Sequence, residues 1–115
     1  MILERADICI ADLNPVQGSE QSGIRPVIIF QNNNISQYSS TIIIIPLTTN
    51  LRRAELPSFV LISPESNGLF EKSVALCHQI RVIDKKRILK KIGKINNNVL
   101  FEIETTLLLT LGYYN

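Results

Sequence analysis

The sequence predicts a small, mainly-β domain in which short strands form a barrel and one amphipathic helix packs against it. Runs of β-branched residues, such as the four isoleucines at 42–45, are too short for good helices and favour the pleated conformation. Polar turns rich in Gly, Pro, Asn and Ser separate these runs. Near the end of the chain, apolar residues recur at helical spacing and form one stripe: Leu100, Ile103, Leu107 and Leu111. Several strands followed by one such helix are typical of a β-barrel with a packed helix.

The length of the chain, 115 residues, suits a single domain spanning residues 1–115. Apolar residues make up 45% of the sequence, which is enough to bury a core without metal or disulfide support. We expect strands over residues 7–13, 27–31, 41–47, 57–63, 73–82 and 91–95. Because Pro46 has no amide hydrogen, it should lie at an edge or a bulge.

Capping residues define the expected helical segments. Asp84 is a plausible N-cap for a short helical turn over residues 85–89, and the asparagines at 96–98 offer an N-cap for a helix over 99–111. Gly112 is a suitable stop for that helix. The polar segment 32–40 is expected to be a turn, and the loop over 14–24 is long enough to suggest a function.

The two cysteines, Cys9 and Cys77, each lie within an apolar run and have no His or Cys at metal-ligand spacing. The single histidine excludes a multi-histidine zinc site, so we expect neither a metal nor a cofactor. Two buried thiols fit a cytosolic protein at least as well as one secreted disulfide. The N-terminus lacks the pattern of a signal peptide, and the longest apolar run is too short to span a membrane. These features predict a cytoplasmic protein.

The net charge is only +2, but its distribution is uneven. Between Arg81 and Lys94 there are seven Lys or Arg residues and one acid, Asp84. Such a segment is either a solvated face or a contact surface for a polyanion, and the sequence leaves both open.

The sequence lacks a P-loop, a dinucleotide fingerprint and a metal-ligand cluster. Catalysis by a Ser/His/Asp triad would need His78, which lies in a predicted strand without an obvious orienting partner. Arg, Thr, Ser, Gln and Asn instead gather at loop–strand junctions. This set suits cleavage of RNA without a metal, since the 2′-hydroxyl is the nucleophile and a guanidinium neutralises phosphate charge. Arg25 and Thr48 are the candidates, although from composition and spacing alone a surface arginine and a loop-capping threonine are the more ordinary interpretations of these positions.

Five motifs stand out along the chain: ADLNP at 11–15, GSEQSGIRPVIIFQN at 18–32, PLTTN at 46–50, LP at 56–57 and QIRVIDKKRI at 79–88. Together they resemble the MazF/PemK family of toxin endoribonucleases from bacterial toxin–antitoxin pairs. The resemblance covers essentially the whole chain. It implies an SH3-like barrel, shared with the gyrase-poisoning CcdB toxins, that assembles as a homodimer. It also implies metal-independent cleavage of single-stranded RNA at a short sequence, leaving 2′,3′-cyclic phosphate and 5′-hydroxyl ends. The partner would be a small MazE-like antitoxin with an acidic, disordered tail.

The resemblance also implies roles for individual residues. Arg25 matches the catalytic arginine and Thr48 the threonine that holds the scissile phosphate. Residues of the first loop would close over RNA, and further positions would line the RNA path and read bases. The first-loop residues are Ser19, Glu20 and Gln21, and the further positions are Leu56, Pro57, Ser73 and Gln79.

Two positions depart from the family pattern. The family's start is often R-G-D, and this chain has Ala6 in place of the glycine. The residue before Gln79 is often acidic, and here it is His78, which puts the recognised RNA sequence in doubt. Two other interpretations remain: a non-nucleolytic CcdB-like toxin that binds a topoisomerase, and an interaction module that retains the fold without toxicity.

Overall fold

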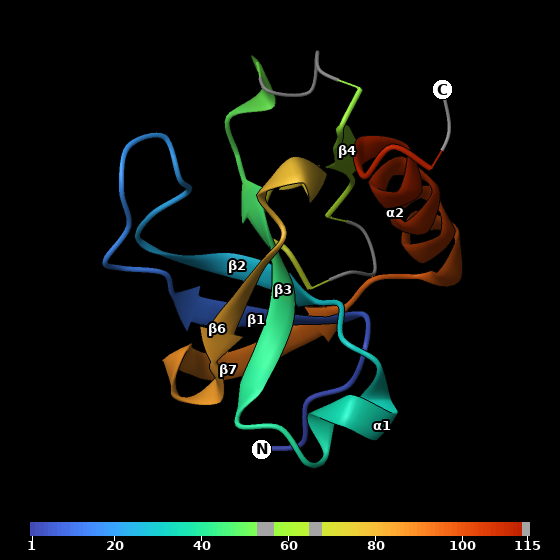
Figure 1. Ribbon diagram of the computed structural model, residues 1–115. Coiled ribbons are helices and arrows are strands. Elements are labelled where there is room, and N and C mark those ends of the chain that lie inside the picture. Colours follow the sequence, from blue (N-terminus) through green and yellow to red (C-terminus); the bar gives the residue numbers. More distant parts are fainter. Residues whose placement is uncertain (53–56, 65–67, 114–115) are drawn as a thin grey trace.

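The structure is a computed structural model that describes residues 1–52, 57–64 and 68–113. Within these residues the chain forms seven strands and two α-helices, and Figure 1 shows α2 beside the curled sheet. The strands are β1 (Asp7–Asp12), β2 (Ile24–Ile29), β3 (Thr41–Thr48), β4 (Phe59–Ile62), β5 (Ser73–Leu76), β6 (Arg81–Asp84) and β7 (Ile88–Lys94). The helices are α1 (Asn33–Ser36) and α2 (Asn97–Thr110), with 3-10 turns η2 (Cys77–Gln79) and η3 (Lys85–Arg87). The predicted mainly-β class with a C-terminal helix is confirmed.

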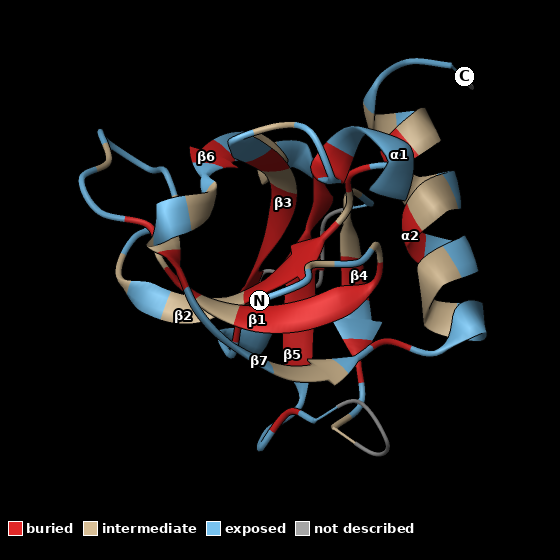
Figure 2. Cartoon of the chain, turned by 90° about the horizontal axis from the view of Figure 1, so that it is seen from below, coloured by how far each residue is buried: buried red, intermediate tan, exposed pale blue. Residues whose placement is uncertain are grey.

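The sheet is antiparallel throughout and has β3 near its centre. Its order is β4-β5-β3-β2-β1-β7, and β6 pairs with the other end of β3. Both faces of the central strands are covered, which explains their continuous apolar runs. One core lies against α2 and includes Ile28, Ile45 and Ile103. The second core includes Val27, Ile29 and Ile44. Figure 2 shows the buried residues concentrated in β1, β3 and β5.

The expected single strand over residues 73–82 is wrong, because η2 divides it into β5 and β6. Both halves pair with β3, but in different registers: Leu47 lies opposite Ala75, whereas Ile44 lies opposite Arg81. If the pairing of β5 with β3 continued without a break, Ile44 would lie opposite residue 78 instead of Arg81. Three extra residues are therefore accommodated in η2, which moves His78 and Gln79 out of the sheet.

An edge of the sheet was one of the two positions expected for Pro46, because it has no amide hydrogen. Pro46 lies instead in the central strand β3. Phe30 N donates to Ile43 O on the β2 side of β3. Because backbone groups alternate along a strand, the nitrogen of Pro46 points to the opposite side. There β3 changes partner from β6 to β5, between Ile44 and Leu47. Pro46 thus occupies a gap in the pairing of a central strand.

Most other element bounds differ from the predicted ones by a few residues. The predicted turn at 32–40 contains α1, which Asn32 caps through Asn34 N. The last strand, β7, begins at Ile88 and so shortens the helical turn before it to η3. The capping role of Asp84 is confirmed, since its carboxylate accepts from Lys86 N at 2.8 Å.

Helix α2 begins and ends close to the predicted residues. Asn96 caps it by accepting from Val99 N at 2.9 Å, and Gly112 follows its end with φ +89°. Ile103 and Leu107 are buried as predicted, but Leu111 is 58% exposed and is not part of the apolar face. The helix is long enough for four turns but does not qualify as a membrane span, and no other described helix does.

Arg5 fastens the start of the chain to α2. Its guanidinium lies 2.6 Å from the carboxylate of Glu104 and stacks over the ring of Phe30, 4.6 Å from the centroid. The next residue, Ala6, has φ +81°, a conformation that favours glycine. Backbone hydrogen bonds from Ala6 N to Ile29 O and from Ile95 N to Ala6 O hold it there.

Much of the basic segment from Arg81 to Lys94 stabilises the fold. Lys91 and Lys94 lie 2.9 and 3.7 Å from the buried carboxylate of Asp7. Lys85 donates to Ser36 O, and Arg87 donates to the carbonyls of Asp12 and Asn14. The polyanion-binding alternative therefore concerns the remaining cations of the segment: Arg81, Lys86 and Lys90.

Both cysteines are buried free thiols that belong to different cores. Burial raises the pKa of Cys9 to about 11 and that of Cys77 to about 12. Both side chains are therefore protonated at neutral pH and act as apolar core residues.

Gly68 is required where its loop meets β7. It has φ +83°, and a Cβ atom there would lie 2.3 Å from the carbonyl oxygen of Ile92. Gly68→Ala is expected to destabilise the protein by more than about 2 kcal/mol, because backbone strain and a backbone clash add. Urea denaturation measures the loss. The control is Gly18→Ala, which has φ +55° and open space around it and should cost about 1 kcal/mol. Equal losses for the two variants would contradict the close approach.

Candidate active site

The candidate site opens where β2 and β3 stop pairing. Their last paired residues are Val27 and Pro46. Since Phe30 N donates to β3, alternation directs the nitrogen of Pro26 toward β3 as well. Pro26 has no N–H, so it cannot continue the ladder at this point. The strand ends beyond it border a cleft.

Arg25 and Thr48 meet in this cleft. Continued two residues beyond Val27 and Pro46, the strand register places Arg25 opposite Thr48. Residues opposite each other in this way project to the same face of a sheet, with Cβ atoms about 5 Å apart. Arg25, Thr48 and Ser73, from three neighbouring strands, line one cleft of about 200 Å³. The sequence motif thus brings together a guanidinium and two hydroxyls.

The guanidinium of Arg25 is held by the first loop. Its Nε donates to Ser22 O, and the Gln21 amide, with its oxygen turned toward the guanidinium, accepts from Nε and Nη2 at 3.2 Å each. Partial burial lowers the pKa of Arg25 from its ordinary value. An arginine nevertheless stays protonated near neutrality, and a partly desolvated cation attracts a phosphate more strongly.

The hydroxyls of Thr48 and Ser73 are fixed by backbone contacts. Thr48 Oγ1 accepts from Asn50 N at 3.2 Å, which leaves its O–H able to donate to a ligand. Ser73 Oγ donates to Glu71 O at 3.1 Å, so its side chain supports the turn at the mouth of the cleft. Both residues are buried: Thr48 is 8% exposed and Ser73 is 3% exposed.

The first-loop residues and Gln79 define a second cleft. Ser19, Glu20 and Gln79 line this cleft, which has a volume of about 440 Å³. Gln21 joins the two clefts, since its backbone N donates to Gln79 Oε1 at 2.6 Å while its side chain faces Arg25. The three-residue turn η2 is therefore the element that brings Gln79 to the first loop.

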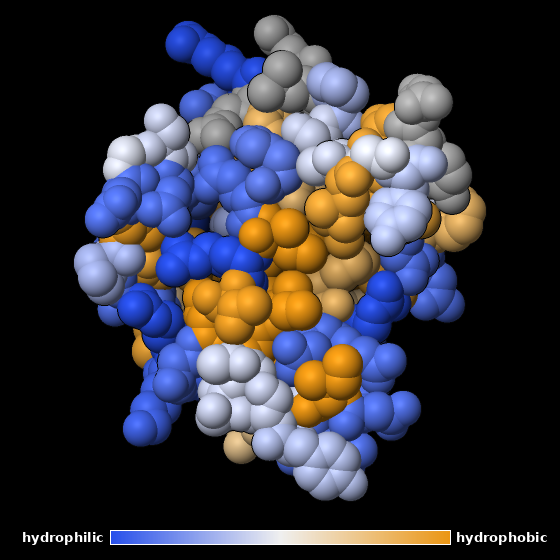
Figure 3. All heavy atoms as spheres, viewed as in Figure 1, coloured by the Kyte–Doolittle hydropathy of each residue, from blue (hydrophilic) through white to orange (hydrophobic). Residues whose placement is uncertain are grey.

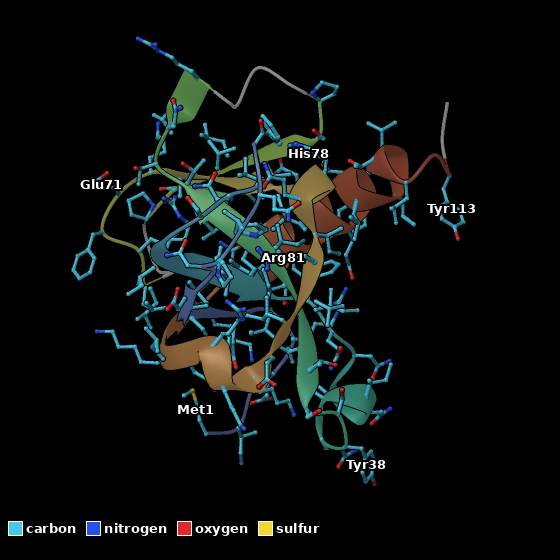
Figure 4. All side chains as sticks on the ribbon, turned by 60° about the vertical axis from the view of Figure 1, so that its left-hand side comes forward. Met1, Tyr38, Glu71, His78, Arg81 and Tyr113 are labelled. Carbon is cyan, nitrogen blue, oxygen red and sulfur yellow. The ribbon has the colours of Figure 1, made fainter. Side chains whose placement is uncertain are left out.

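His78 and Arg81 also line the second cleft, and Figure 4 shows both near the centre of that view. His78 packs against the ring of Phe59, with centroids 4.9 Å apart, and its Nδ1 lies 3.4 Å from Ser58 Oγ. Arg81 Nη1 is buried without a hydrogen-bond partner among the residues that the structure describes. A buried donor of this kind suits an anionic or carbonyl ligand.

Two predicted RNA-path residues are not placed in either cleft. Leu56 lies outside the described residues. Pro57 is exposed at the start of the turn before β4.

Sequence reasoning missed several residues of the site. A third cleft of about 520 Å³ adjoins the Arg25 cleft and shares Ile24, Arg25, Pro26, Thr49 and Ser73 with it. It adds Phe70, Glu71 and Lys90 from other elements, and Figure 4 shows Glu71 at the left edge of the molecule. The basic segment from Arg81 to Lys94 indicated a possible polyanion contact that includes Lys90, but no local sequence pattern indicates a role for Phe70.

Comparisons with known proteins place this chain in the toxin class of type II toxin–antitoxin systems. A family model described as PemK-like, MazF-like toxin of type II toxin-antitoxin system matches residues 4–111. The endoribonuclease MazF of Staphylococcus epidermidis is 40% identical over 114 residues, which cover 99% of this chain and 95% of that protein. The chain belongs to the PemK/MazF toxin family and is a homologue of that endoribonuclease.

Solved structures show the same fold at lower identity. The crystal structure of MazF from Deinococcus radiodurans matches with a TM-score of 0.85 and 19% identity, covering 97% of this chain and 98% of that one. A mycobacterial endoribonuclease in complex with its cognate antitoxin matches with a TM-score of 0.80 and 22% identity, covering 96% of both chains.

The contact between Gln79 and Gln21 predicts that η2 holds the first loop. Gln79→Ala should increase amide exchange in residues 14–24 about 5-fold, because one hydrogen bond of about 1 kcal/mol is lost. Hydrogen–deuterium exchange by mass spectrometry measures this change. The control is Gln37→Ala, at an exposed glutamine after α1, which should leave the loop unchanged. Unaltered exchange in the Gln79 variant would show that the loop holds its shape without the hydrogen bond to the Gln79 side chain.

Proposed function

We propose that this protein is the toxin of a toxin–antitoxin pair and cleaves single-stranded RNA at specific sequences without a metal. The supporting observation is the meeting of Arg25 and Thr48 in one cleft at the ends of β2 and β3. A cation with parallel donors and a hydroxyl donor together suit a phosphodiester group. The homology to an endoribonuclease over nearly the whole chain gives the proposal further support.

The proposed reaction uses the 2′-hydroxyl of the substrate as nucleophile. Its oxygen attacks the adjacent phosphorus, the bond from phosphorus to the 5′-oxygen breaks, and the 2′-hydroxyl proton passes to water, from which Arg25 is reprotonated after it has protonated the leaving oxygen. Thr48 holds the scissile phosphate by donating to a non-bridging oxygen. Arg25 neutralises the charge that builds on phosphorus oxygens and supplies a proton to the leaving 5′-oxygen, for which its lowered pKa is favourable. The products are a 2′,3′-cyclic phosphate and a 5′-hydroxyl, and cleavage of mRNA inhibits translation and growth.

Base recognition falls to the second cleft in this proposal. The amide of Gln79 can both donate and accept, as reading the edge of an unpaired base requires. Ser19, Glu20 and Gln21 close over the RNA from the first loop, and Ser73 supports the path between the clefts. Leu56 and Pro57 extend that path in the proposal.

The proposed partners are a second copy of the chain and an antitoxin with an acidic, disordered tail. Figure 3 shows apolar side chains gathered at the centre of one face, surrounded by hydrophilic ones. On β6, Val82 is 56% exposed, lies opposite Ile43 of β3 and follows Ile80 by two residues. A homodimer through the exposed side of β6 would border the Gln79 cleft, because Ile80, which lines that cleft, directly precedes β6. An acidic tail complements the cations of the clefts, and the proposed location is the cytoplasm.

Incubation of the purified protein with a long unstructured RNA in EDTA tests the activity. We expect discrete fragments with 5′-hydroxyl ends, and no cleavage of DNA of the same sequence, because DNA lacks the nucleophile. Intact RNA together with stalled gyrase complexes would instead favour a CcdB-like toxin that binds a topoisomerase. Intact RNA and normal growth on induced expression would favour an interaction module without toxicity.

Substitutions at the two central residues test the mechanism. Arg25→Ala should lower the cleavage rate by about 10²- to 10³-fold, since one oxyanion donor contributes about 3–4 kcal/mol, and should leave folding and dimerisation intact. Thr48→Ala should lower the rate strongly but retain RNA affinity. Arg25→Lys and Thr48→Ser are the matched controls and should recover part of the rate. An Arg25→Ala variant that cuts at the normal rate would remove arginine from the mechanism.

A further inference from the structure

Phe70 is fully exposed beside the proposed catalytic cleft. Its exposure is 99%, so its ring contributes nothing to the folded core. Aromatic side chains dominate the energetics of interfaces, so a ring exposed at the rim of a cleft is well suited to contact a ligand there. Its place in the structure therefore suggests a role in binding.

The backbone that carries Phe70 is anchored on both sides. Gly68 lies in close contact with the backbone of Ile92 and Gly93, and Leu69 is buried in the core against α2. On the other side, Ser73 is buried in β5 and its hydroxyl donates to Glu71 O. The ring is consequently presented from a fixed turn, and little backbone order would have to be gained on binding.

The cleft that Phe70 borders is continuous with the Arg25 cleft. The two share Arg25, Pro26 and Ser73, and the larger one has a volume of about 520 Å³, within the range of small-ligand sites. Its walls combine the apolar side chains of Ile10 and Ile24 with the cation of Lys90. Glu71 is the acid among the lining residues, so two cations face one carboxylate.

An apolar wall, an exposed ring and adjacent cations match the requirements of single-stranded RNA. Proteins bind unpaired bases by stacking them on aromatic side chains while cations follow the phosphates. We propose that Phe70 stacks against the base of a nucleotide adjacent to the scissile phosphate, while Lys90 attracts the next phosphate. This inference rests on the proposed ribonuclease function and adds a positioning residue to it.

Stacking assists binding rather than the chemical step in this proposal. Loss of the ring should therefore raise KM, and change kcat little, because the groups that touch the scissile phosphate remain in place. Stacking on an aromatic side chain accounts for roughly 5- to 100-fold in affinity per base. The effect should depend on the π-face and not only on apolar volume.

The test begins by mapping the cleavage sites of the unaltered protein on a long RNA. A short single-stranded RNA containing one such site is then made with a 2′-deoxy nucleotide at the cut, which prevents cleavage, and with 2-aminopurine on either flank in two separate oligonucleotides. Binding to the unaltered protein should quench the fluorescence of one of the two labels. Phe70→Ala should abolish the quenching and weaken binding about 5- to 100-fold, whereas Phe70→Trp should retain both.

Phe101→Ala, the same change at a 69% exposed phenylalanine on α2, is the matched control and should bind as the unaltered protein does. Phe70→Leu should behave like Phe70→Ala, and a leucine variant with full affinity would overturn stacking in favour of simple apolar contact. Unchanged RNA binding by Phe70→Ala would also overturn the inference, even if affinity for an acidic peptide fell, since the ring would then serve the antitoxin. If the unaltered protein cuts no RNA, the proposed ribonuclease function is wrong. If it cuts RNA but the Phe70 variants bind RNA normally, only the stacking role of Phe70 is wrong.

Discussion

The absence of one amide hydrogen, at Pro26, is the constraint on which the site depends. Elsewhere β2 pairs continuously with both neighbours, and a continuous ladder would fill the space at its end with backbone hydrogen bonds. Because Pro26 cannot donate toward β3, pairing stops at Val27 and Pro46. The strand ends remain in register without being joined, so Arg25 and Thr48 face each other across an open cleft. The barrel behind them fixes this spacing, since both strands are buried on both faces.

The rest of the molecule arranges further groups around that opening. The first loop holds the guanidinium through Ser22 and Gln21, and Gln21 also connects it to Gln79 on η2. A single glutamine therefore contacts both the proposed catalytic cation and the proposed base reader. Binding at either cleft would alter the surroundings of the other through this residue.

The sequence was sufficient to predict the fold class, the capped C-terminal helix and the family. It also identified Arg25 and Thr48 as candidate site residues, because Gly and Pro in the local sequence mark the loop–strand junctions where both residues lie. The division of residues 73–82 was not predictable, since SVALCHQIRV alternates without a break and the three-residue slip appears only in the pairing with β3. Phe70 was missed for a similar reason: its significance comes from Gly68 and Leu69 packing against distant strands. The prediction that Leu111 belongs to the apolar stripe was wrong: the helix ends at Thr110, and Leu111 is exposed.

The register slip on β3 has a consequence for how this toxin can diversify. Because β5 and β6 each pair with β3 in their own register, His78 and Gln79 between them lie outside the sheet, whereas Cys77 stays buried in the core and its N donates to Ser58 O. The side chains at positions 78 and 79 can therefore be exchanged while the pairing of β5 and β6 with β3 persists. Under the proposed function, a relative with other side chains at these two positions would recognise a different RNA sequence on the same scaffold.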